Sequence, residues 1–229
     1  GGKAMSNNTS GTANIAVGTI SLFNNSDGSN SIAIGHGALY GNIGGYNIAI
    51  GNEAMYSSSN TSSNNGGNNL AIGKSALYEN SGGQGNVAIG NNSLYSNSNG
   101  TENVAIGNIS LFSNLTGGQN IAIGGALISN TSGDTNIGIG YGSLNNNNVG
   151  GQNLAIGKEA LYSNLASRNT AIGNFSLSQN VSGTINTAVG YLSLRQNLTG
   201  DRNVGLGDGS LNYNEDGSYN VAIGSVALT

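Results

Sequence analysis

The chain of 229 residues contains no cysteine, no proline and no tryptophan, and only 7% of its residues are charged. The absence of cysteine excludes disulfides, thiolate metal sites and thiol nucleophiles. The single histidine, His36, cannot form a histidine-rich metal site. Six Lys and Arg against ten Asp and Glu leave no basic surface for nucleic acid. We therefore expect no catalytic residue, no metal, no cofactor and no nucleic-acid partner.

Long apolar runs are also missing, so we expect no insertion into a membrane. The chain opens with GGKAMSNNTS, which lacks the apolar core of a signal peptide. It starts and stops within a repeat, without an atypical capping copy at either end. We therefore interpret it as a segment of a longer fibre.

Glycine and asparagine are abundant instead, with 40 and 41 residues. Such a composition with so little charge would indicate disorder if it had no period. A period is present, because the string N-[IVL]-A-I-G recurs along the whole chain. Its first residues are Asn14, Ser31, Asn47, Asn69, Asn86, Asn103, Asn120, Asn136, Asn153, Asn169, Asn186, Asn203 and Asn220. Eight of the twelve spacings are 17 residues, three are 16 and one is 22, so the chain is a repeat array.

The consensus of one copy is N-I-A-I-G-x-x-[AS]-L-Y-x-N-x-x-G-x-x, numbered here from position 1 to position 17. Position 5 is glycine in every copy, position 9 is Leu or Met, and position 12 is almost always Asn. The one long spacing places five extra residues in the polar stretch Ser57–Asn68. We expect this stretch to be a surface loop.

A single copy is too short for a pair of helices and is rich in strand formers. Positions 1 to 5 alternate and contain Ile and Val, which favours a strand ended by the glycine at position 5. Positions 8 to 12 predict a second short strand, and positions 13 to 17 predict a turn. The fold class is therefore all-β: a parallel β-solenoid (β-roll) of about thirteen 17-residue coils. Residues 1–229 form one array, with a surface-loop insertion at about 57–68.

Parallel stacking places each position of the repeat on the same position of the next coil. The asparagines at positions 1 and 12 are then expected to form ladders, since an amide can donate to one neighbour and accept from the other. The aliphatic residues at positions 2 and 4, together with Leu at position 9, are expected to fill the interior.

Position 3 points away from positions 2 and 4, and it carries only small residues. An apolar strand without a polar face is normally covered on both sides. We therefore predict that position 3 forms a close contact with another copy of the chain. The residues of this candidate inter-chain face are Ala16, Ala33, Ala49, Ala71, Ala88, Ala105, Ala122, Gly138, Ala155, Ala171, Ala188, Gly205 and Ala222.

Position 10 carries a row of aromatic residues, which should point outward if Leu at position 9 points inward. The residues of this candidate outward aromatic stripe are Phe23, Tyr40, Tyr56, Tyr78, Tyr95, Phe112 and Tyr162. Two interpretations remain open. The rings stack on one another and shield the chain, or they form a stripe on which a glycan stacks.

The repeat resembles the head repeats of trimeric autotransporter adhesins and related repeats of bacteriophage tail fibres and bacterial surface fibres. The likeness covers essentially the whole chain through motifs such as NIAIG at Asn47–Gly51 and NVAIG at Asn86–Gly90. It implies a left-handed β-roll and a homotrimer. The chain departs from such heads in its period of 17 and its added L-Y segment, and it has no neck, coiled-coil stalk or membrane anchor.

The predicted function is that of a non-enzymatic extracellular fibre on a cell surface or virion. It would be an adhesin head or shaft, or a tail-fibre segment, acting as a rigid rod for multivalent attachment. A glycan or a host-surface receptor would be its partner, besides the other chains of the trimer. The alternative is a monomeric solenoid that binds ice or another surface, although Thr is irregularly placed.

Overall fold

The computed structural model describes residues 1–41, 43–57 and 66–228 of the chain. All regular secondary structure in this part consists of β-strands of three residues, and each strand covers positions 2 to 4 of one repeat. The chain forms two compact units, Gly1–Gln119 (unit 1) and Asn120–Thr229 (unit 2). The boundary between the units coincides with a boundary between two copies of the repeat.

Unit 1 contains the first six strands and unit 2 contains the other seven. The strands of unit 1 are β1 (Ile15–Val17), β2 (Ile32–Ile34), β3 (Ile48–Ile50), β4 (Leu70–Ile72), β5 (Val87–Ile89) and β6 (Val104–Ile106). The strands of unit 2 are β7 (Ile121–Ile123), β8 (Ile137–Ile139), β9 (Leu154–Ile156), β10 (Thr170–Ile172), β11 (Thr187–Val189), β12 (Val204–Leu206) and β13 (Val221–Ile223).

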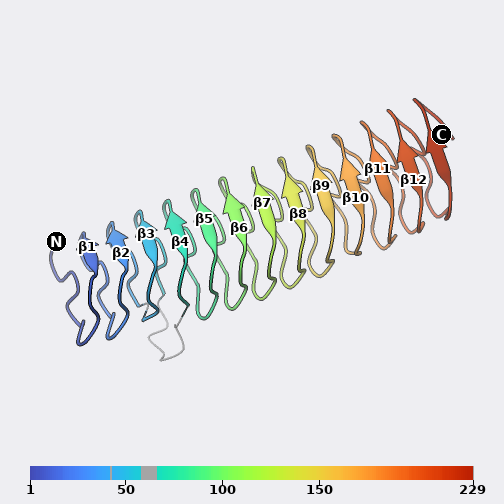
Figure 1. The fold of residues 1–229 in the computed structure, drawn as a ribbon. Helices are drawn as coiled ribbons and strands as arrows, with labels where there is room; N and C mark the ends of the chain where they lie inside the picture. Colours follow the sequence, from blue (N-terminus) through green and yellow to red (C-terminus); the bar gives the residue numbers. More distant parts are fainter. Residues whose placement is uncertain (42, 58–65, 229) are drawn as a thin grey trace. The chain divides into compact units, whose positions relative to one another are not determined.

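Consecutive strands within each unit pair in parallel and in register, in the order of the chain (Figure 1). Ala88 of β5 lies beside Ala105 of β6, and each coil contributes one strand to the sheet. The register survives the inserted segment, because Ala49 of β3 pairs with Ala71 of β4. Residues 58–65, the middle of the predicted surface loop, lie outside the described residues. The predicted all-β parallel β-solenoid is confirmed.

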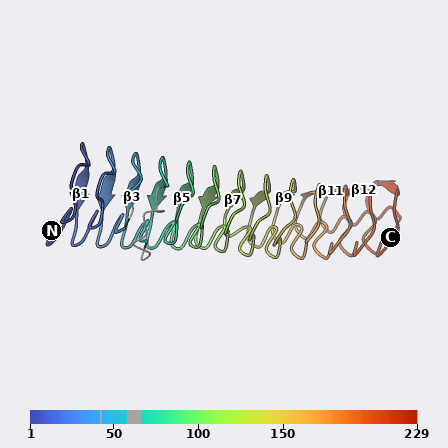
Figure 2. The same cartoon turned by 90° about the horizontal axis from the view of Figure 1, so that it is seen from below.

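The predicted second strand at positions 8 to 12 is wrong, because this segment is a series of turns. Leu at position 9 has a left-handed backbone conformation, as at Leu94 (φ 49°), and so does the residue at position 7 just before the segment, as at Asn92 (φ 51°). Left-handed φ costs an ordinary residue about 1–2 kcal/mol. The turns of neighbouring coils are still joined by backbone hydrogen bonds, since the Leu94 amide donates to the Ser110 carbonyl at 2.9 Å. The winding is visible when the chain is seen from below (Figure 2).

The predicted inter-chain face at position 3 is wrong as well, because these residues line the interior of their own chain. From Ala33 to Ala188 the alanines at this position are fully buried within the single chain. A Cβ at Gly205 would lie 2.7 Å from the Ser193 Oγ and 3.3 Å from the Leu194 Cγ. Positions 8 and 9 therefore form the wall opposite position 3. The coil is so thin that only a methyl group or a hydrogen fits between them.

The thirteen residues at position 3, which were predicted to form the inter-chain face, therefore lie on the inner surface of the strands. They are Ala16, Ala33, Ala49, Ala71, Ala88, Ala105, Ala122, Gly138, Ala155, Ala171, Ala188, Gly205 and Ala222. Leu at position 9 completes the core as expected, and from Leu22 to Leu194 this row is almost wholly inaccessible to solvent.

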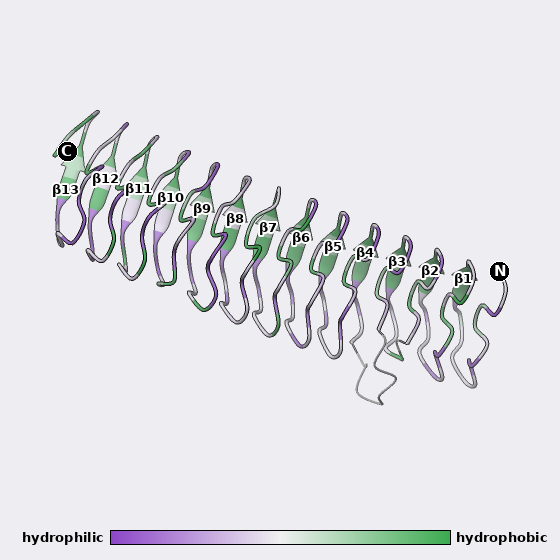
Figure 3. Ribbon diagram, turned by 180° about the vertical axis from the view of Figure 1, so that it is seen from behind, coloured by the Kyte–Doolittle hydropathy of each residue, from purple (hydrophilic) through white to green (hydrophobic). Residues whose placement is uncertain are grey.

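The aliphatic side chains at positions 2 and 4 point outward, contrary to the prediction that they fill the interior. Most strands have a half-buried first residue, a buried second residue and a third residue that is half-buried or exposed. Alternation along a strand requires this result once the small residue at position 3 points inward. The apolar character of the strands is visible in Figure 3.

The two predicted asparagine ladders are confirmed. At position 1, the Asn86 Oδ1 accepts a hydrogen bond from the backbone amide of Asn103 at 3.0 Å. At position 12, the Asn97 Nδ2 donates to the Asn80 Oδ1 at 2.8 Å. Both rows are buried, so the amides satisfy polar groups that water cannot reach.

Candidate interaction surfaces

The outer surface of the strands is an apolar feature of each unit. Positions 2 and 4 of the thirteen copies are aliphatic except for Thr170 and Thr187. We call these residues the aliphatic face. Within unit 1, Ile34, Ile50 and Ile106 are 37–39% exposed. None of the residues at these two positions is charged, so the face offers apolar contact only.

The two threonines are the only polar residues of the aliphatic face. They lie in neighbouring strands, since Thr170 pairs with Thr187. Both strands are paler than the others of unit 2 in the hydropathy view (Figure 3). A pair of hydroxyls in one place is too local to form a regular polar array.

The aromatic residues at position 10 form a continuous stack in unit 1, from Phe23 to Phe112. The five ring pairs have centroids 4.7–5.4 Å apart and planes within 3–18° of each other. Each inner ring therefore has both faces covered by its neighbours. Of the two interpretations, self-stacking is confirmed, and a glycan cannot lie on the faces of the inner rings.

Tyr162, the seventh residue of the predicted stripe, is half-buried in unit 2 and does not belong to this stack. Its neighbours at position 10 are Asn145 and Ser178, which have no rings. The row then continues with Arg195. The aromatic stripe is thus a feature of unit 1 alone.

The ring stack changes the acidity of its hydroxyls. Burial is the main cause that raises the pKa of Tyr56, Tyr78 and Tyr95 above the ordinary value for tyrosine. Repulsion from the Glu53 carboxylate raises the pKa of all three further. These hydroxyls therefore stay neutral at physiological pH, and the row carries donors and acceptors without charge.

The charged side chains are placed at the turns. His36 is exposed at position 6. The Asp201 carboxylate accepts hydrogen bonds from the Thr184 amide at 2.6 Å and from its hydroxyl at 2.9 Å. These bonds hold the pKa of Asp201 below its usual range. In the part of the chain that the structure describes, no three metal-ligating side chains come together.

One corner of unit 2 brings together residues that the sequence analysis did not single out. Phe175 and Tyr191 meet nearly at right angles, with ring centroids 6.2 Å apart and planes inclined by 78°. They line a hollow of about 250 Å³ with Leu192 and Arg195. The signal in the sequence is Arg195, which stands at position 10 in place of the aromatic residues of unit 1.

None of the described residues belongs to a helix with the length and hydropathy of a membrane span. Comparison with known proteins finds no matching family model, no similar curated protein and no similar solved structure.

Proposed function

We propose that the chain is a non-enzymatic structural segment of an extracellular fibre, whose copies associate through the aliphatic face. The observation that carries this proposal is the outward exposure of two aliphatic rows on a parallel sheet. Parallel sheets occur almost only with both faces covered, since their strands are apolar on both sides. The interior covers one face of each strand, and the aliphatic face needs a second cover.

A second copy of the chain is the cover that fits best. The two rows repeat at the strand spacing of about 4.8 Å. A partner that matches them along a whole unit needs the same period, and an identical chain has it. Closed rotational symmetry then buries the face of every copy. A homotrimer is the assembly that the resemblance to adhesin heads implies.

Attachment would use the remaining surface, which is made of polar turns repeated along the chain. Many weak contacts with a glycan or a host-surface receptor would combine through a high effective concentration. A cell surface or a virion is the setting in which such a fibre would act.

The test is the mass of the assembly in solution, measured by light scattering and sedimentation. The double variant Ile89→Lys and Ile106→Lys places two cations on the aliphatic face of β5 and β6. We expect the native chain to be a trimer and this variant to be a monomer with an unchanged circular dichroism spectrum, because both side chains point outward. The matched control is Asn91→Lys with Asn108→Lys, at exposed position 6 of the same coils.

A monomeric native chain would contradict the proposed assembly. The exposed, regular face would then be free for a solid surface, as the alternative of an ice-binding solenoid requires. Measurement of thermal hysteresis separates the two functions. Within the aliphatic face, Thr occurs only in β10 and β11, so the face lacks a regular array of hydroxyls. This favours the fibre over the ice-binding alternative.

A further inference from the structure

The hollow between Phe175, Tyr191, Leu192 and Arg195 differs from the rest of the aromatic surface in one respect. In unit 1 the rings lie parallel and cover one another. In unit 2, Phe175 and Tyr191 form an open corner, and Tyr191 is 51% exposed. Ring surface is therefore available here for a ligand.

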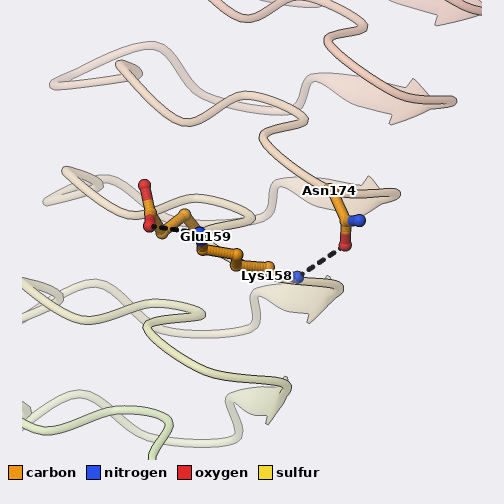
Figure 4. A network of polar contacts seen from close by, with 3 residues as sticks. All are labelled: Lys158, Glu159 and Asn174. Atoms are coloured by element: carbon orange, nitrogen blue, oxygen red, sulfur yellow. Dashed lines mark hydrogen bonds and ion pairs between the residues drawn. The ribbon is translucent and has the colours of Figure 1, made fainter.

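The geometry of the corner follows from the repeat. Phe175 occupies position 7 and Tyr191 occupies position 6 of the next coil, so the rings cannot lie in one column. The Asn174 Oδ1 accepts a hydrogen bond from the Lys158 amide at 2.9 Å, which joins the turn before Phe175 to the coil below (Figure 4). This bond fixes the position of the turn that carries the Phe175 ring.

The two cations near Phe175 differ in their partners. The Lys158 Nζ lies 5.3 Å from the centroid of the Phe175 ring. It also lies 3.7 Å from a carboxylate oxygen of Glu159 (Figure 4). The half-buried Arg195 guanidinium makes no hydrogen bond or ion pair with any residue that the structure describes. Its planar set of N–H donors is therefore free to bind a planar anion through two parallel hydrogen bonds.

We propose that this hollow binds one carboxylated sugar residue of an acidic glycan. The apolar C–H face of a pyranose ring would cover the exposed aromatic surface of Tyr191, and the sugar carboxylate would pair with Arg195. Small-molecule sites typically combine aromatic and aliphatic side chains with a few polar groups, and this hollow has Phe175, Tyr191 and Leu192 beside the Arg195 guanidinium. A hollow of about 250 Å³ suits a single sugar ring. The site deepens the attachment function proposed above and rests on it for its biological role.

The test is calorimetric titration of the assembled protein with two probes, trigalacturonate and sialyllactose. They separate a polymer uronate from a terminal sialic acid, and binding of either probe supports the proposal. Methyl-esterified trigalacturonate has the same rings without the charge, and we expect it to bind at least about tenfold more weakly.

Two variants locate the site. Arg195→Gln should weaken binding of the acidic probe at least about tenfold, since a charge-assisted hydrogen bond is lost. Tyr191→Ala should abolish it. The matched controls are Arg168→Gln and Tyr141→Ala, two exposed positions of the same unit, and they should bind as the native chain does.

Failure of both acidic probes to bind would overturn the proposal. Equal binding of the methyl ester, or an Arg195→Gln variant with native affinity, would overturn it as well. Light scattering of the same samples keeps the two proposals apart: a monomer that still binds the acid contradicts only the proposed assembly, and a trimer that does not bind it contradicts only the proposed sugar site.

Discussion

Asn86 and Asn97 both donate a side-chain hydrogen bond to the carbonyl oxygen of Gly100, each at 2.9 Å. The two buried ladders of the solenoid thus meet at one backbone oxygen in each coil. A Cβ at Gly100 would lie 2.4 Å from the Asn97 Oδ1 and from the Asn114 Nδ2. The convergence of the ladders therefore explains why position 15 is usually glycine.

Asn97→Asp should destabilise the chain by about 3 kcal/mol at neutral pH, because buried groups lose their hydrogen bonds. Asn97 Nδ2 donates to Asn80 Oδ1 and to the Gly100 carbonyl, and a carboxylate can donate to neither. Asn99→Asp, an exposed position two residues away, is the control. The loss should be smaller at about pH 4, where a protonated carboxyl regains one donor. Thermal melting followed by circular dichroism measures both effects, and equal losses for the two variants would contradict the ladder's role.

Gly90→Ala should cost more than about 3 kcal/mol, since its backbone has φ 130° and an added Cβ would lie 2.5 Å from the Gly107 carbonyl oxygen. Gly85→Ala is the matched comparison. Gly85 has φ 67°, and its nearest heavy atom would be 3.6 Å from the Cβ, so the cost should be about 1 kcal/mol. Urea unfolding of the two variants tests the difference. A tolerated Gly90→Ala would mean that the coils do not stack this closely.

Ala105→Leu should destabilise the chain itself by about 1–3 kcal/mol, because three carbons are added to a filled interior. The melting temperature should fall by the same amount at every protein concentration, since a core substitution does not depend on assembly. Asn108→Leu, at an exposed position of the same coil, should have little effect. A loss that grows on dilution would instead place Ala105 at a contact between chains.

The stacked tyrosines should make stability fall at alkaline pH. Burial raises the folded-state pKa of Tyr56, Tyr78 and Tyr95 above the unfolded value of about 10. Their contribution is therefore complete below about pH 10 and is lost as the pH rises through the folded pKa. Melting curves across this range, with ultraviolet absorbance of the phenolate, measure the effect.

Tyr78→Phe keeps the stack and removes one titrating hydroxyl, so this variant should lose less stability in alkali. Tyr141→Phe, at an exposed position outside the row, is the control. If Tyr78→Phe loses as much stability as the native chain, the ring row does not carry the alkaline transition.

The sequence by itself determined the repeat, the parallel stacking, the asparagine ladders and the aromatic row of unit 1. The physical reason is that a solenoid places each position on its own copy in the next coil. A residue type kept at one position must then be able to pack against itself. Amides can do so by donating and accepting, and rings can do so by stacking.

Only the tertiary structure decided which face of the strands is the interior. Both faces are apolar, so alternation separates Ala105 from Ile106 without saying which one points inward. The thickness of the coil decides, because positions 8 and 9 leave room for a methyl group and not for Ile. The tertiary structure also decided the left-handed φ of Leu94, since a leucine side chain has no preference for this conformation. The corner of Phe175 and Tyr191 joins different positions of neighbouring coils, and an alignment of the repeats does not display such a contact.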